Sequence, residues 1–308
     1  MASDEQQQRM VGGRVRRSAH FVPGANEKML TKSLALAADA LVLDLEDAVT
    51  PDRKDEARGV VSGWLADVDF GRQERVVRMN PLDSPWWRAD LEATMVNPPD
   101  SYLVPKIRGP EDVVQIDQVI SDLERKHGHP AGGVRLLVLG TETAEGLLRI
   151  RDIPTASARV DALTWGAEDL SAALGARRNR DEHGELLEVF RYARIMCLVA
   201  AVAARVQPLD TVYVDINNHE GLRADCVEGA AMGFTGKITI HPNQVDVVND
   251  VFTPNEVEVA EAQELLDAFE DNRKAGRMAF AFKGQMVDVP HLQRAQRILA
   301  VAAAIAAS

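Results

Sequence analysis

Eight short apolar runs, separated by longer amphipathic stretches, constrain the fold of this chain more than any other feature. Their spacing is typical of βα units, in which a helix follows each strand and covers one face of the sheet. The runs predict strands at Ser18–Val22, Ala40–Leu43, Arg75–Met79, Tyr102–Val104, Arg135–Leu139, Ala162–Thr164, Thr211–Val214 and Gly236–Ile240.

The amphipathic stretches predict helices between these strands. The clearest are Glu27–Ala38, Pro51–Leu65, Pro110–Arg125 and Leu186–Arg205, and Pro51 and Pro110 suit a first helical turn. A doubly wound open sheet is the rival architecture, but it usually has a Gly-rich phosphate turn after its first strand, which Val22–Asn26 is not. Eight strands therefore favour a (β/α)₈ barrel, which typically needs about 250 residues.

Composition excludes several classes of partner. The formal net charge of −12 disfavours binding to nucleic acid and to anionic membranes. The two cysteines suggest neither a disulfide framework nor a metal cluster, and they fit a reducing cytoplasm. Residues 1–16 are polar and are expected to be a flexible N-terminus rather than a signal peptide. Ile298–Ala307 is too short to span a bilayer.

Charged residues follow nearly every predicted strand. Because function in a barrel lies where strands end and loops begin, these positions predict a charged site at one mouth of the barrel. In chain order they are Asp44, Glu46, Asp47, Arg78 with Asn80, Lys106, Glu142, Glu168, Asp169, Asp215 and His241.

Glu142 and Asp169 are candidate metal ligands because they follow adjacent strands, so that their carboxylates can converge. Two carboxylate oxygens completed by water and substrate oxygens describe a typical Mg²⁺ site. Alternatively, both acids could simply complement helix dipoles. No His or Cys cluster competes, which makes zinc a poor candidate.

Three further residues each have a structural and a functional interpretation. Arg78 could form a salt bridge with one of the acids of Asp44–Asp47, or it could hold a substrate carboxylate or a developing oxyanion. Lys106 has the same two interpretations, and with Glu46 and Asp47 it is expected to surround the site. His241 is more often a hydrogen-bonded structural histidine than a base.

The pattern changes after about residue 251. A helix over Asn255–Arg273 leads to a Gly-containing segment, Ala275–Val289, and then to a final helix from Pro290. This tail could be a cap on the barrel or a lid that closes the active site. The expected division is a barrel over residues 17–252 and a C-terminal lid over residues 253–308.

Eight short motifs are spread along the chain in a fixed order: Phe21–Lys28, Leu43–Val49, Val77–Asn80, Glu142–Gly146, Trp165–Leu170, Glu228–Lys237, Ile240–Val245 and Lys283–Pro290. In these motifs the chain resembles the citrate lyase beta-like family of the HpcH/HpaI aldolase superfamily, and especially its citramalyl-CoA and malyl-CoA lyases. Each motif alone is moderately specific, but their order and their span along the chain make the resemblance strong.

The resemblance implies a role for particular residues. Mg²⁺ would be held by Glu142 and Asp169, and Arg78 would touch the substrate oxygens. Asp288 would be the catalytic acid or base, carried by a lid that reaches a neighbouring subunit of a homotrimer or a dimer of trimers. The acyl-CoA thioester would be bound by Phe21, Lys28, Lys32 and the backbone around Ile238 and Thr239.

The implied enzyme is a Mg²⁺-dependent carbon–carbon lyase. It would cleave a 3-hydroxyacyl-CoA such as citramalyl-CoA or malyl-CoA to acetyl-CoA and a small keto acid, pyruvate or glyoxylate. Two alternatives stay open. One is a citrate lyase beta subunit that acts on a carrier-protein thioester, and the other is a malyl-CoA thioesterase or malate synthase-like activity.

Overall fold

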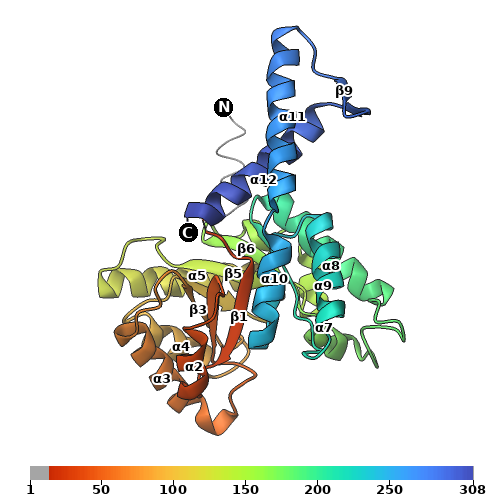
Figure 1. Cartoon of the computed structure of the whole chain (residues 1–308). Helices are drawn as coiled ribbons and strands as arrows, with labels where there is room; N and C mark the ends of the chain where they lie inside the picture. Colours follow the sequence, from red (N-terminus) through yellow and green to blue (C-terminus); the bar gives the residue numbers. More distant parts are fainter. Residues whose placement is uncertain (1–13, 308) are drawn as a thin grey trace.

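The computed structural model describes residues 14–307 and contains a closed, all-parallel barrel of eight strands (Figure 1). The expected (β/α)₈ fold is therefore confirmed. Each strand pairs with its neighbours in sequence, and β1 closes the barrel by pairing with β8. The strands are β1 (Ser18–Pro23), β2 (Ala40–Asp44), β3 (Glu74–Arg78), β4 (Ser101–Val104), β5 (Arg135–Leu139), β6 (Val160–Thr164), β7 (Gln207–Asp210) and β8 (Gly236–Thr239).

Seven of the eight predicted strands overlap the observed ones, but the seventh was misplaced. The expected strand was Thr211–Val214, whereas β7 is Gln207–Asp210. The β-branched residues after Thr211 are typical of a strand, and Pro208 argues against one because proline has no N–H for the ladder. The strand tolerates Pro208 nonetheless, and its carbonyl accepts the backbone N–H of Thr235 at 3.0 Å.

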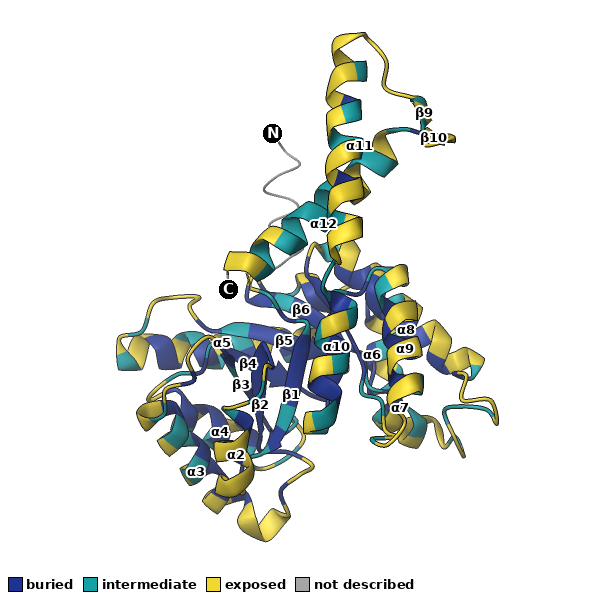
Figure 2. Ribbon diagram, viewed as in Figure 1, coloured by how far each residue is buried: buried dark blue, intermediate teal, exposed yellow. Residues whose placement is uncertain are grey.

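The helices surround the barrel, and most of them cover its strands with buried apolar faces (Figure 2). The predicted helix at Glu27–Ala38 is shorter, since α2 ends at Ser33. The others lie within a few residues of their expected positions. Around the barrel the helices are α2 (Glu27–Ser33), α3 (Lys54–Asp67), α4 (Trp87–Thr94), α5 (Pro110–His127), α6 (Ala144–Arg149), α7 (Ala167–Leu174), α8 (Glu188–Ala204), α9 (His219–Met232) and α10 (Val245–Phe252).

Two separate cores result from the alternation of side chains along each strand. One lies between the strands and the helices, and the other is a smaller aliphatic cluster contributed by alternate residues of the strands, such as Val42, Val76 and Leu137. Below this inner cluster, at the N-terminal ends of the strands, the buried Arg16 pairs with Glu74 and Asp161 and donates to Gln207 at 3.0 Å. The expected flexible segment 1–16 otherwise lies largely outside the described residues.

The C-terminal residues form an arm that stands off the barrel (Figures 1 and 2). It consists of α11 (Glu256–Lys274), an antiparallel hairpin of β9 (Phe280–Phe282) and β10 (Gln285–Val287), and α12 (Val289–Ala307). The sequence pattern predicts both helices but not the hairpin. Phe269 of α11 packs edge-on against Phe280, with ring centroids 4.8 Å apart.

The arm rises from the N-terminal side of the strands. The end of α12, with Ala304 and Ala307, lines a groove together with Asp39, Glu74 and Asp100, which precede or begin β2, β3 and β4. Arg297 of α12 also donates to the carbonyl of Gly233, just before β8, at 3.0 Å. Within residues 14–307, no helix is long and apolar enough to cross a membrane.

Candidate active site

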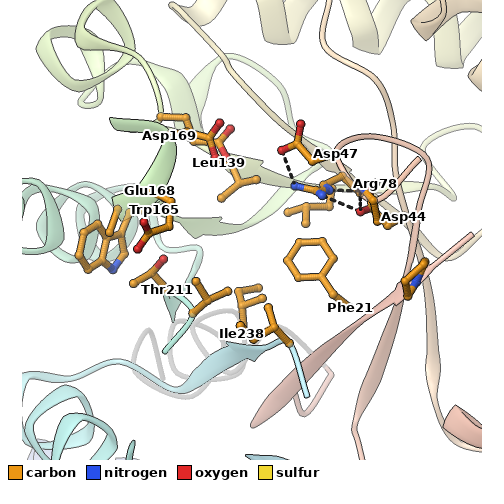
Figure 3. A pocket seen from close by; sticks show the side chains of 18 residues that line it. Phe21, Asp44, Asp47, Arg78, Leu139, Trp165, Glu168, Asp169, Thr211 and Ile238 are labelled. Atoms are coloured by element: carbon orange, nitrogen blue, oxygen red, sulfur yellow. Dashed lines mark hydrogen bonds and ion pairs between the residues drawn. The ribbon is translucent and has the colours of Figure 1, made fainter. Parts of the chain in front are cut away.

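A cavity of about 410 Å³ opens at the C-terminal ends of the strands, opposite the arm. Its floor is apolar, and charged side chains stand around its wall (Figure 3). Asp44, Asp47 and Arg78 lie on one side of it, and Glu168 and Asp169 on another. This is the mouth that the charged strand ends predicted.

The structure brings Glu142 and Asp169 to the same cavity. Glu142 follows β5 and is almost fully buried, whereas Asp169 belongs to the first turn of α7 and is partly exposed. Gly166 makes room for Glu142, because a Cβ at this glycine would lie 2.7 Å from the glutamate Cγ. Burial raises the pKa of Glu142 well above its usual value, and the charges of Asp169 and Glu46 raise it further.

Lys106 contacts both of these carboxylates. Its backbone N–H donates to Glu142 Oε2 at 2.6 Å, and its ammonium lies 3.3 Å from Asp169 Oδ1. The same ammonium pairs with Glu46 at 2.7 Å and with Asp47 at 3.4 Å. Lys106 has a left-handed backbone with φ +54°, which is uncommon for a residue with a side chain and often found at functional sites.

Arg78 forms the salt bridge that its structural interpretation required, and it also lines the cavity. Its Nε and Nη2 donate to the two oxygens of Asp44 at 2.7 and 2.6 Å, and its Nη1 lies 2.8 Å from Glu46 Oε2. The guanidinium stands 4.5 Å from the ring centroid of Phe21. Burial raises the pKa of Glu46 to about 7, although Arg78 and Lys106 oppose this effect.

The residues expected to bind CoA divide into two groups. Phe21 and Ile238 line the cavity, whereas the side chain of Thr239 is buried behind it and lies 3.0 Å from His20 Nδ1. Lys28 and Lys32 are exposed on α2, the helix that follows β1, at the same end of the barrel as the cavity. Neither lysine lines the cavity.

Asp288 is not brought to the cavity of its own chain. It lies in the arm between β10 and α12, about 40% exposed, and pairs with His291 Nδ1 at 2.7 Å. Of the two apolar residues that precede it, Val287 is buried but Met286 is 66% exposed. In the single chain the arm is therefore neither a cap on the mouth nor a lid over it.

Two other expectations are resolved by contacts. His241 caps the short 3₁₀ helix at Pro242–Gln244, which supports its structural interpretation. Asp215 was expected at the end of the seventh strand, but it lies in a loop where it accepts the backbone N–H of Asn217. Because β7 ends four residues earlier than Val214, the acid at its end is Asp210, which sequence analysis missed.

Among residues 14–307, no group of three or more His, Cys, Asp or Glu side chains is arranged to hold a metal ion. The pair of Glu142 and Asp169 supplies two carboxylates, so it is not a group of this kind. A charged cavity at the C-terminal mouth of a (β/α)₈ barrel defines the class of this protein: a barrel enzyme whose site is rich in carboxylates.

The chain belongs to the HpcH/HpaI aldolase/citrate lyase family, whose model matches residues 17–242. The mitochondrial citramalyl-CoA lyase of Rattus norvegicus is 38% identical over 302 residues, which cover 94% of this chain and 87% of the relative. A (3S)-malyl-CoA thioesterase of Cereibacter sphaeroides is 36% identical over 291 residues, or 94% of this chain and 96% of the relative.

The fold also resembles a solved structure, the CitE protein of Mycobacterium tuberculosis in complex with magnesium, acetoacetate and coenzyme A. The TM-score is 0.77 at 33% identity, with 94% of this chain and 98% of the other covered. Family membership and fold together place this chain among carbon–carbon lyases.

Proposed function

We propose that this protein is a Mg²⁺-dependent lyase that cleaves a 3-hydroxyacyl-CoA with a carboxylate at C3, such as citramalyl-CoA or malyl-CoA. The products are acetyl-CoA and pyruvate or glyoxylate, and the reaction is a reversible Claisen-type cleavage. The observation that carries the proposal is the convergence of Glu142, Asp169 and Arg78 on one cavity at the barrel mouth. The similarity to a citramalyl-CoA lyase and to a CoA-bound CitE supports it.

The electrostatics of the mouth suit a divalent cation. Arg78 and Lys106 contact five carboxylates between them, so the described mouth has more negative than positive charge. Burial is the main reason that the pKa of Glu142 is raised, and the charges of Asp169 and Glu46 raise it further; a bound cation would oppose both effects. Glu142 and Asp169 would hold Mg²⁺, with water and substrate oxygens as further ligands. When bound, Mg²⁺ supplies Lewis-acid polarisation of the substrate oxygens.

Arg78 is placed to stabilise negative charge on oxygen as the carbon–carbon bond breaks. Asp44 and Glu46 hold its guanidinium in one orientation, and Phe21 supports one face of it. Preorganised donors of this kind typically contribute about 3–4 kcal/mol to lowering a barrier. The apolar floor, which includes Leu103, Leu139 and Ile238, excludes water from beneath the reacting carbons.

Cleavage removes one proton from the C3 hydroxyl, which becomes the keto group, and adds one proton to the methylene carbon of the departing acetyl-CoA enolate. Asp288 is the proposed acid/base that takes up the first proton and delivers the second. Since the arm stands on the opposite side of its own barrel, Asp288 has to act at the mouth of a neighbouring subunit. The lid over residues 253–308 would then link activity to assembly, as a homotrimer or a dimer of trimers. Lys28 and Lys32, one helical turn apart and exposed on α2, would meet the CoA phosphates.

The similarity to a malyl-CoA thioesterase supports a second candidate function. In it, thioester hydrolysis follows carbon–carbon bond formation or replaces cleavage. A third, cleavage of a carrier-protein thioester, follows from the citrate lyases that the family includes.

Assays of the purified protein with citramalyl-CoA, malyl-CoA and β-methylmalyl-CoA separate these functions. We expect acetyl-CoA together with a keto acid from at least one substrate, loss of turnover in EDTA and recovery with Mg²⁺. Free CoA and a hydroxy acid would instead identify a thioesterase. Turnover of a carrier-protein thioester alone would identify a citrate lyase subunit, and full activity after exhaustive chelation would contradict the metal role.

A further inference from the structure

A buried charged network lies behind the cavity wall, and the proposed chemistry does not use it. Its centre is Asp210 at the end of β7, which has no exposed surface. Asp210 pairs with Arg194 of α8 at 2.7 Å and with Lys237 of β8 at 3.4 Å, and Lys237 pairs with Asp225 of α9 at 2.6 Å. Burial alone would lower the pKa of Lys237, but Asp210 and Asp225 outweigh it and raise that pKa.

Burying this network costs free energy, which suggests that it has a role beyond stability. Charges taken out of water are expensive, and apolar residues of similar volume often give equal or better stability. The surroundings nonetheless fix Asp210 closely: Gly229 of α9 lies so near that a Cβ there would be 2.9 Å from Asp210 Oδ2. The network therefore holds one carboxylate in one position.

Asp210 also accepts the backbone N–H of Thr211 at 2.9 Å, and a further partner of Asp210 is part of the cavity wall. Trp165 lines the cavity, is 1% exposed, and donates its indole N–H to Asp210 Oδ1 at 2.7 Å. A hydrogen bond from a neutral donor to a buried carboxylate is stronger and more directional than one between neutral groups. Trp165 is thus anchored at its polar end, and its position depends on Asp210.

Trp165 begins the segment that carries Asp169, one of the two proposed metal ligands. Gly166 packs against Glu142, Glu168 lines the cavity, and Asp169 faces Lys106, all within four residues of the indole. Figure 3 shows Trp165 beside Glu168 on the wall opposite Arg78. Because Trp165 directly follows β6, the bond that holds its indole also restrains where this segment leaves the strand, four residues before Asp169.

We propose that Trp165, anchored by Asp210, is a positioning residue that sets the geometry of Asp169 and of the cavity wall for Mg²⁺ binding. This inference rests on the proposed function. It assigns the buried network of Arg194, Asp210, Asp225 and Lys237 to the site rather than to stability alone. Partners that orient metal ligands typically contribute about 10- to 100-fold to metal affinity.

The test compares Trp165→Phe with Trp64→Phe in the full-length protein. Trp165→Phe keeps an aromatic ring in the wall and removes the N–H that Asp210 accepts. Trp64 of α3, which packs edge-on against Phe70, is the matched control. Calorimetry would measure the Kd for Mg²⁺, and two-dimensional NMR of ¹⁵N-labelled protein would follow the indole N–H signals during the Mg²⁺ titration. Melting temperatures would report on folding.

We expect Trp165→Phe to raise the Kd for Mg²⁺ about 10-fold or more, and Trp64→Phe to leave it within twofold. In the wild type, Mg²⁺ should shift the indole signal of Trp165 but not that of Trp64. Equal Mg²⁺ affinity in Trp165→Phe and the wild type would overturn the inference alone, whatever the melting temperature. A wild type that binds no Mg²⁺ would overturn the proposed function and this inference together.

Discussion

The two ends of the barrel use the same residue types to opposite effect. At the N-terminal ends of the strands, Arg16 is buried among Glu74, Asp161 and Gln207 and has no exposed side-chain surface. At the C-terminal ends, Arg78 is also buried and is paired with three acids, but it borders a cavity of about 410 Å³. One arginine closes the barrel floor, and the other helps to form a site.

The difference lies in charge balance and access. At the floor, Glu74 and Asp161 pair not only with Arg16 but also with Arg14 and Arg135, respectively, so the guanidinium groups match the carboxylates. At the mouth, Arg78 and Lys106 face five carboxylates around open space. Balanced, buried charge specifies structure, whereas unbalanced charge beside a cavity requires a ligand. Variants at each end should therefore change different quantities.

The largest expected effect is on stability, from Arg16→Met. The change removes the guanidinium that lies closest to the buried Glu74, so we expect the free energy of unfolding to fall by about 3–5 kcal/mol. Urea unfolding would measure this, and kcat of the folded fraction should stay within twofold. A stable Arg16→Met protein with impaired turnover would break the distinction between the two ends.

Arg78→Lys should affect catalysis more than folding. Lysine keeps the charge beside Asp44 but lacks the planar fork, so kcat/KM should fall by about 10²–10³-fold. Arg75→Lys is the matched control, because Arg75 lies on the same strand near the floor and pairs with the partly exposed Asp100. Equal losses of activity in both variants, or an Arg78→Lys protein that unfolds, would favour a purely structural role for Arg78.

Asp288→Asn tests whether the arm serves a neighbour's mouth. Folding, assembly and Mg²⁺ binding should be intact, and kcat should fall by about 10²-fold or more because proton transfer to the enolate is slowed. Asp271→Asn, an exposed change elsewhere in the arm, is the control. Mixing Asp288→Asn with inactive Asp169→Asn protein should restore part of the activity. If subunit exchange is verified and none returns, the inter-subunit role fails.

The smallest effect is expected at the rim. Lys28→Ala combined with Lys32→Ala should raise the KM for CoA thioesters about tenfold and change kcat little, because two exposed ammonium groups near the mouth attract phosphates without touching the reacting atoms. Steady-state kinetics at two salt concentrations would measure this. A KM that does not change would place CoA elsewhere.

Much of the mouth could be predicted because barrel geometry converts sequence position into spatial position. Glu142 and Asp169 follow two predicted strands and Arg78 lies at the end of a third, and a barrel brings all such positions to one end. The convergence of these residues on one cavity could therefore be predicted without knowledge of any contact. The same logic placed Glu46, Asp47 and Lys106 around them.

The failures have local causes. Because Pro208 is unusual in a strand, β7 was predicted four residues too late in the chain. Asp215 was therefore predicted at the end of this strand in place of Asp210. The bond between Trp165 and Asp210 joins residues 45 apart in sequence, so no local pattern indicates it. The direction of the arm depends on how α12 packs at the barrel floor, and periodicity predicts a helix but not where it points.

The central claim is that the excess of carboxylates at the mouth is a metal site. Isothermal titration of chelated, desalted protein with Mg²⁺ tests it most directly, for the wild type, Asp169→Asn and the distant control Arg75→Lys. We expect one Mg²⁺ per chain for the wild type and for Arg75→Lys, and no measurable binding for Asp169→Asn. Absence of binding to the wild type, or unchanged binding to Asp169→Asn, would contradict it.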